Sequence, residues 1–116
     1  MAPPTQVAEV HVADRLFLGR EIPGGGFVSD EEWAAFLSEV VTPHFPDGLT
    51  IWRAQGQWLD PRGNLVQEPV FVLEVFHRGG TDAEASVQAI AIEYKRRFRQ
   101  DAVLRITAPI KLHFFE

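Results

Sequence analysis

One acidic residue, Glu74, interrupts the most apolar stretch of this chain, which runs from Val70 to Phe76. A carboxylate among apolar side chains must either pair with a cation or bind a proton. Glu74 is therefore either half of an ion pair or a general acid or base in an apolar cavity. The cations that we consider for the ion pair are Arg20, Arg53 and Arg105.

Two histidines could act together with this carboxylate. His77 and His113 each lie at the end of an apolar segment and could reach the same rim, so Glu74, His77 and His113 are the candidate catalytic residues. The four histidines of the chain have neither the i,i+4 nor the i,i+2 spacing of a metal site on a helix or strand. The serines are not in a Gly-x-Ser-x-Gly elbow. We expect no metal, no cofactor and no serine hydrolase.

Three arginines, each in an otherwise apolar segment, could supply the polar groups of a small-molecule site. Such sites are mostly apolar, with a few convergent polar groups. Trp58 and Tyr94 could add aromatic walls, although each is also consistent with packing against the rest of the protein. The candidate ligand-binding residues are Arg20, Arg53, Trp58, Glu68, Tyr94 and Arg105.

The composition excludes several classes of protein. With 116 residues, 46% of them hydrophobic, the chain is long enough to bury a core as one domain. A net charge of −5 and a pI near 5.3 argue against nucleic-acid binding, which needs a basic surface. The chain contains no cysteine, which excludes disulfides and cysteine nucleophiles.

The N-terminus and the hydropathy pattern predict where in the cell the protein is found. No apolar stretch approaches the roughly 20 residues that a membrane span requires. Met1–Thr5 lacks the basic start and hydrophobic run of a secretory signal. We therefore expect a cytoplasmic protein that does not enter a membrane.

The elements that must position these residues follow from patterning and turn signals. Strands are predicted over 15–22, 49–58, 65–77 and 103–115, with a bulge or an unpaired stretch at Pro69 and a break near Pro109. Helices are predicted to begin at Ser29 and Thr81, each a capping box with Glu three residues later. Pro43 and Pro46 are expected to close the first helix. Residues 1–12 form an N-terminal arm and 13–116 a single domain.

This order of elements is that of a ferredoxin-like α+β fold, βαββαβ. Right-handed crossovers place both helices on one face of a four-stranded antiparallel sheet. The other face should then alternate with polar residues, yet the segments 16–18 and 70–76 are apolar on both faces. Such a surface needs a cover: a second copy of the chain, an apolar ligand or the N-terminal arm. We expect a homodimer with a cavity between the two sheets.

Four sequence blocks carry a family resemblance. They are Thr42-Pro43-His44-Phe45-Pro46-Asp47-Gly48-Leu49-Thr50, Gly56-Gln57-Trp58, Glu68-Pro69 and Tyr94-Lys95-Arg96-Arg97-Phe98-Arg99-Gln100. With these blocks the chain resembles an uncharacterised bacterial family, a domain of unknown function with family number 3574, from about Arg15 to Phe114. The resemblance implies no reaction. It singles out the Gly56-Gln57-Trp58 turn, Glu68, Arg97 and Gln100 as polar groups in distinctive blocks.

Three functions are consistent with these observations. The first is a homodimeric binding or assembly module whose apolar, arginine-containing cavity between the sheets holds a small molecule. The second is a cofactor-independent enzyme, an oxygenase or an isomerase-like proton-transfer enzyme, that uses the same cavity; this rests on analogy of fold alone. The third is a regulatory partner of a larger protein. We favour the first.

Overall fold

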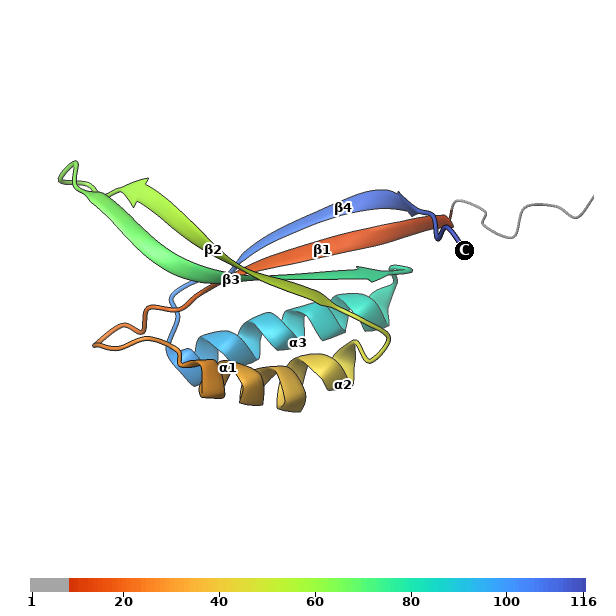
Figure 1. Cartoon of the computed structure of the whole chain (residues 1–116), viewed down its shortest axis with the longest axis horizontal. Coiled ribbons are helices and arrows are strands. Elements are labelled where there is room, and N and C mark those ends of the chain that lie inside the picture. The colour runs from red at the N-terminus through yellow and green to blue at the C-terminus, as the bar shows by residue number, and fades with distance from the viewer. Residues whose placement is uncertain (1–8) are drawn as a thin grey trace, which may run out of the picture.

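The computed structural model describes residues 9–116 as a four-stranded antiparallel sheet with helices on one face (Figure 1). The strands are β1 (Glu9–Gly19), β2 (Thr50–Leu59), β3 (Leu65–His77) and β4 (Leu104–Leu112). Their order across the sheet is β2-β3-β1-β4, so β1 pairs with both β3 and β4. The α+β architecture predicted from the sequence is confirmed at this level.

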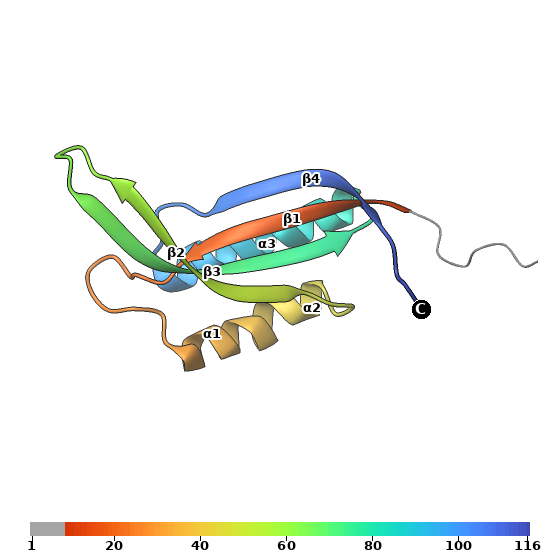
Figure 2. The ribbon, with the colours of Figure 1, turned by 45° about the horizontal axis from the view of Figure 1, so that its top comes forward.

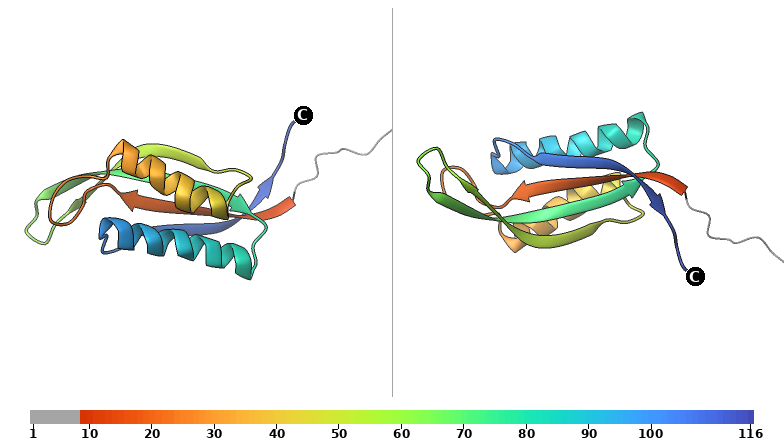
Figure 3. Two further views of the ribbon diagram at one scale, coloured as in Figure 1. Left: turned by 90° about the horizontal axis from the view of Figure 1, so that it is seen from below. Right: turned by 90° about the horizontal axis from the view of Figure 1, so that it is seen from above.

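Two helical segments pack side by side against the same face of the sheet, as Figures 1 and 2 show. The first consists of α1 (Asp30–Phe36), a π-helical turn η1 (Leu37–Val41) and α2 (Thr42–His44) without a break. The second is α3 (Thr81–Phe98). Seen from the opposite side, in the right panel of Figure 3, the strands lie in front of the helices.

The core lies between the sheet and the helices. Alternate residues of β1 and β3 point toward the helices, among them Leu16, Leu18, Phe71 and Leu73, and all four are buried. The ring of Trp33 in α1 stacks on that of Phe71 with centroids 4.0 Å apart. The other buried aromatic residues of the core are Phe36, Tyr94 and Phe98.

One of the two predicted capping boxes forms. The Ser29 hydroxyl accepts a hydrogen bond from the Glu32 amide, and the Glu32 carboxylate accepts one from the Ser29 amide, which confirms the first box. The Thr81 box is wrong: Gly80 is the N-cap of α3, and Thr81 is already the first helical residue. Glu84, the expected partner of Thr81, instead binds an arginine of β4.

The prolines affect their elements in different ways. The helical segment continues through Pro43 and ends at His44, two residues before Pro46; Pro43 is accommodated because the wider π turn of η1 comes directly before it and Thr42 donates to Leu37, five residues back. No bulge forms at Pro69. It pairs with Gln55 of β2 but lies beyond the last β1–β3 pair, as the alternative of an unpaired stretch predicted, and its carbonyl accepts from Arg20. Pro109 does not break β4, which is an edge strand and tolerates the missing donor.

The first strand starts earlier than predicted. β1 begins at Glu9, so residues 9–12 of the predicted N-terminal arm pair with β4. The rest of that arm, 1–8, lies outside the described residues. Among the helices of residues 9–116, none is long and apolar enough to cross a membrane. The cytoplasmic location stays a prediction.

Candidate functional site

The face of the sheet opposite the helices is apolar across all four strands. We call it the uncovered face, because residues 9–116 place no helix over it (Figure 3). Register pairs define its central row, which is Trp52, Val72, Phe17 and Leu104. Trp52, Phe76, Ile106 and Leu104 each leave between 38% and 61% of their surface exposed. The predicted apolar surface is therefore present in the described part of the chain.

A pocket of about 640 Å³ lies at the end of the sheet where β2 begins and β3 ends. We call it the end pocket. Glu74, Phe76 and Thr50 belong both to its lining and to the uncovered face, so the two surfaces are continuous. The chain after β4 crosses this end of the sheet and adds Phe114 (Figure 3). Further lining residues are His11, His44, Phe45, Pro46, Asp47, Gly48, Leu49, His77, Arg78 and Leu112.

Glu74 forms an ion pair, but not with an arginine considered above. Arg15 lies directly across from it on β1, and its Nε and Nη2 donate to Glu74 Oε2 at 3.0 and 2.5 Å. The Arg15 guanidinium also lies 5.5 Å from the centre of the Trp52 ring. Aligning the apolar runs 16–18 and 71–73 would have identified this pairing, because it sets Arg15 opposite Glu74 on one face.

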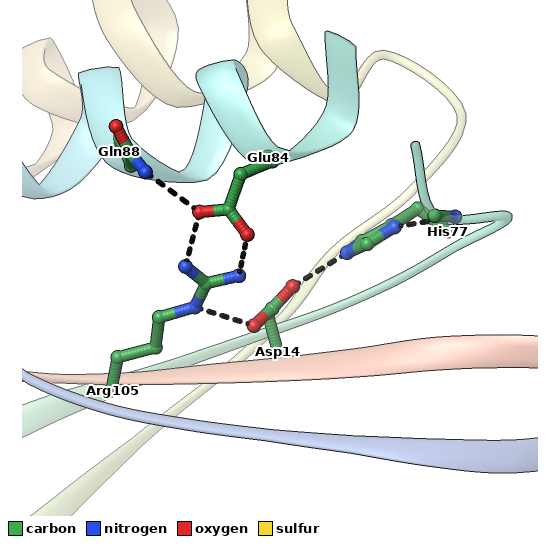
Figure 4. Close-up of polar contacts among 6 residues, drawn as sticks. Asp14, His77, Glu84, Gln88 and Arg105 are labelled. Carbon is green, nitrogen blue, oxygen red and sulfur yellow. Dashed lines mark hydrogen bonds and ion pairs between the residues drawn. The ribbon is translucent and has the colours of Figure 1, made fainter. Parts of the chain in front are cut away.

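His77 has hydrogen bonds at both ring nitrogens (Figure 4). The Gly79 amide donates to Nδ1 at 2.9 Å, so Nδ1 must be unprotonated. Nε2 then carries the proton and donates to Asp14 at 2.5 Å. We assign the neutral Nε2–H tautomer from this network. His77 lines the end pocket, yet it can accept a proton only by losing the bond from Gly79.

Arg105 lies on the helix side of the sheet, where it joins β4 to α3 and β1 (Figure 4). Its Nε donates to Asp14 at 2.7 Å, and its two Nη groups donate to Glu84 at 2.6 and 3.0 Å. Burial raises the pKa of the fully buried Asp14, but hydrogen bonds from Arg105, His77 and Thr107 outweigh burial and leave the pKa below its usual value. Asp14 was not predicted as a site residue, because the strand was predicted to begin one residue later.

Arg20 and Arg53 also point to the helix side. Arg20 donates twice to the Val28 carbonyl, at 3.1 and 2.8 Å, and both arginines bind Asp30. Their guanidinium groups lie 4.5 and 5.7 Å from the centre of the Phe71 ring. These contacts hold the loop before α1. The expectation that Arg20, Arg53 and Arg105 face a cavity between two sheets is therefore corrected.

Tyr94 is part of the core. Its hydroxyl donates to the Gly19 carbonyl at 2.7 Å, and burial raises its pKa. Trp58, in contrast, lies near the tip of the β2–β3 hairpin, half exposed. His113 follows β4 and stacks loosely against Phe115, and it is not among the described residues that line the end pocket. The candidate catalytic residues thus come together only in part, at Glu74 and His77.

Glu68 lies at the other end of the sheet. A Cβ at Gly19 would lie 3.0 Å from Glu68 Oε1 and 3.0 Å from Gln100 Oε1, so a larger residue here would press on the ends of both side chains. Burial raises the pKa of Glu68, and the nearby charge of Glu21 raises it further. Two of the polar groups singled out by the resemblance, Glu68 and Gln100, therefore lie close together beside Gly19. Within residues 9–116, no group of three or more His, Asp or Glu side chains could hold a metal ion.

Two solved structures are similar to this one. One is a phage SAM lyase in complex with S-methyl-5'-thioadenosine, with a TM-score of 0.65 and 16% identity over 90% of this chain and 90% of that chain. The other is a phage SAM lyase in the apo state, with a TM-score of 0.61 and 16% identity over 90% of this chain and 92% of that chain. At this identity the likeness shows the fold alone.

No curated protein matches the chain. A family described as "Protein of unknown function (DUF3574)" matches residues 13–114, nearly the whole length. The chain therefore belongs to this family of proteins of unknown function, as its sequence blocks indicated.

Proposed function

We propose that this protein is a small-molecule binding module that works as a homodimer, with two copies packed through their uncovered faces and the ligand in the end pocket. The observation that carries this proposal is the apolar central row, which is separated from the end pocket by one row that contains the Arg15–Glu74 ion pair. We also propose a ferredoxin-like classification, which the strand order β2-β3-β1-β4 supports.

The cost of leaving the uncovered face in water supports the dimer. Each large apolar side chain that stays hydrated forgoes roughly 1.5–3 kcal/mol. The central row spans the full width of the sheet, with Trp52 and Leu104 exposed and Val72 buried between them, and exposed apolar patches mark interaction sites on soluble proteins. A second copy offers the same row, so a twofold axis through it brings apolar side chains together.

The charges on this face are compatible with burial. Arg15 and Glu74 neutralise one another within one chain, so covering them buries no unpaired charge. The next row of this face, toward the end pocket, contains the apolar residues Phe76 and Ala108. A partner can therefore cover this face without a charged side chain opposite Arg15 and Glu74.

The lining of the end pocket supports a small, partly apolar ligand. Phe45, Phe76 and Phe114 provide apolar surface, while Thr50 and Asp47 provide hydrogen-bonding groups. The similar phage lyase was captured with S-methyl-5'-thioadenosine, which combines a flat ring with an apolar thioether. This compound is a reasonable first probe for the pocket.

An enzyme in the same pocket is the second candidate, since a similar solved structure is a lyase. Two observations place it second. Glu74 is held by Arg15, and His77 is held at both nitrogens. Neither group is poised to exchange a proton with a ligand. A regulatory partner of a larger protein would compete with the second copy for the same face.

A pair of lysine variants tests the dimer. Ile106 lies on the uncovered face and Ile92 on the outer side of α3, with 46% and 64% of their surface exposed. Ile106→Lys places a charge beside Arg15 within the proposed interface and should give monomers, because an unpaired buried cation costs several kcal/mol. Ile92→Lys is the matched control and should stay dimeric. Light scattering reports both masses, with circular dichroism to verify folding.

Equal masses for the two variants would remove the uncovered face from the proposed interface. Calorimetry with S-methyl-5'-thioadenosine then tests the pocket in the wild-type dimer. Heat of binding to the wild type supports the binding module. Turnover of the probe would instead favour the enzyme.

A further inference from the structure

The β2–β3 hairpin extends beyond the rest of the sheet as a two-stranded ribbon (Figure 1). β1 pairs with β3 only as far as Val70, while the pairing of β2 with β3 continues to the Leu59–Leu65 pair. We call residues 55–69 the hairpin arm. An isolated two-stranded hairpin is marginally stable in water, so the contacts at the base of the arm determine how firmly it is held.

Glu68 lies at the base of the arm, near the end of α3. A backbone hydrogen bond joins this base to the chain after β1, from the Arg20 amide to the Pro69 carbonyl at 3.0 Å. The Glu68 side chain reaches Gly19, because a Cβ at Gly19 would lie 3.0 Å from Glu68 Oε1 and 3.0 Å from Gln100 Oε1. Two oxygen atoms from different elements therefore lie beside the same glycine.

The Gln100 side chain presents its oxygen, and not its nitrogen, to this space. Its Nε2 donates to the backbone carbonyls of Glu21 and Phe98, at 2.9 and 3.2 Å. Both bonds need an N–H group, so they assign the orientation of the amide. An amide oxygen only accepts hydrogen bonds, and so does a charged carboxylate. Glu68 and Gln100 can therefore bond to one another only when Glu68 carries a proton.

The charges near Glu68 favour its neutral form. Burial raises the pKa of Glu68, and the negative charge of Glu21, in the chain after β1, raises it further. Arg20 could neutralise the carboxylate, but its guanidinium is held by the Val28 carbonyl and by Asp30. The arginine next to Glu68 in the fold is therefore committed to the loop before α1.

The other elements around Glu68 do not supply a compensating charge. Burial raises the pKa of Tyr94 in α3, the charge of Arg20 lowers it and that of Glu68 raises it, so the tyrosine stays neutral. Arg99, at the end of α3, places its guanidinium beside Gly24. β2 places a glycine directly opposite Glu68. Ionised Glu68 thus faces the charge of another glutamate and the oxygen of an amide.

We propose that Glu68 and Gln100 form a pH-controlled latch between the hairpin arm and the end of α3. When Glu68 is protonated, its carboxyl group donates to Gln100 Oε1 and the latch is closed. When Glu68 loses the proton, the carboxylate is repelled by Gln100 Oε1 and by the charge of Glu21, and the base of the arm is released. This inference requires neither the homodimer nor a ligand in the end pocket.

The sign of the pH dependence follows from the raised pKa. A carboxyl group whose pKa is raised by folding stabilises the folded protein below its usual pKa, and this contribution is lost as the pH rises through the folded pKa. The latch should therefore be closed in acid and open at neutral pH. Glu68→Gln keeps a donor next to Gln100 and cannot ionise, so it should stay closed at both.

Hydrogen exchange of the backbone amides in the hairpin arm tests the latch. At pH 7 these amides should exchange about fivefold more slowly in Glu68→Gln than in the wild type, which is the effect of one net hydrogen bond. At about pH 4, near the usual pKa of a glutamate, the two proteins should differ much less. Comparison at the same pH removes the intrinsic pH dependence of exchange.

Glu31→Gln, the same change at an exposed glutamate of α1, is the matched control and should exchange like the wild type at both pH values. Arm amides that exchange equally fast in Glu68→Gln and in the wild type at pH 7 would overturn the latch. So would a difference that is as large at pH 4 as at pH 7.

An NMR titration of the Glu68 carboxyl group tests the proton itself. Its pKa in the wild type should lie above the usual glutamate value of about 4.3. Glu21→Gln removes the neighbouring charge and should lower this pKa. A Glu68 pKa at or below the usual value in the wild type would contradict the latch, whatever the oligomeric state of the protein.

Discussion

Asp14 shows how a single buried charge is tolerated in this protein. Its carboxylate receives hydrogen bonds from Arg105 and His77, and Arg105 is held in turn by Glu84 (Figure 4). These bonds connect β1, β4, the end of β3 and the first turn of α3. The network fixes His77 at the rim of the end pocket, so a structural ion pair also determines the shape of the candidate site.

Replacing Asp14 should lower stability in a pH-dependent way. Because the folded pKa of Asp14 lies below the usual value for an aspartate, the charged form stabilises the fold above that usual value, and this contribution is lost as the pH falls through the folded pKa. Asp14→Asn should reduce the free energy of unfolding by about 1–3 kcal/mol at pH 7. The difference from wild type should shrink below about pH 4, the usual pKa of an aspartate, as urea unfolding would measure.

Asp101→Asn, a change at an exposed aspartate, is the control for this prediction and should leave the free energy of unfolding unchanged. A difference between Asp14→Asn and wild type that is the same at pH 7 and at pH 3 would contradict the account of the network.

The charged residues at this scale could be predicted from the sequence, but their partners could not. Glu74 was expected either to pair with a cation or to serve as a general acid or base, and it pairs with Arg15. The three arginines considered as partners belong to the helix side, and Arg15 was overlooked because it stood at the predicted start of a strand. Which face a residue occupies depends on register, and an error of one residue in the register exchanges the two faces.

At the scale of elements, two helices with similar sequences at their start are capped differently. Both Ser29 and Thr81 precede a glutamate by three residues, yet only Ser29 is an N-cap. Gly80, with φ 95°, takes the cap position before α3, and Glu84 is drawn to Arg105. The ion pair between Glu84 and Arg105 thus forms in place of the capping box at Thr81. The sequence near Thr81 could not have predicted this pair, because Arg105 lies in another element.

The two alanine variants should therefore differ. Ser29→Ala removes an observed cap and should lower the free energy of unfolding by about 1 kcal/mol. Thr81→Ala should change it little, since alanine is a good residue at the first helical position. Urea denaturation of both variants measures the difference. Equal losses would mean that Thr81 also caps its helix.

At the scale of the whole molecule, the sequence predicted the feature on which the proposed function rests. Strands that are apolar on both faces indicated a sheet with a second apolar surface, and the central row Trp52, Val72, Phe17 and Leu104 lies on that surface. The end pocket was not predictable. It forms where the loop before β2, the end of β3 and the chain after β4 meet, and these segments share no local pattern.

The length of the β2–β3 hairpin could not be predicted from the sequence either. Residues 49–58 and 65–77 were predicted as its two strands. The pattern of these residues does not show that the pairing of β3 with β1 stops at Val70 while its pairing with β2 continues to Leu65.

The molar mass of the wild-type protein in solution tests the central claim most directly. Light scattering at micromolar concentration should give twice the 13.1 kDa of one chain, because the proposed dimer buries the uncovered face against a second copy. A mass of one chain across that concentration range would contradict the homodimer.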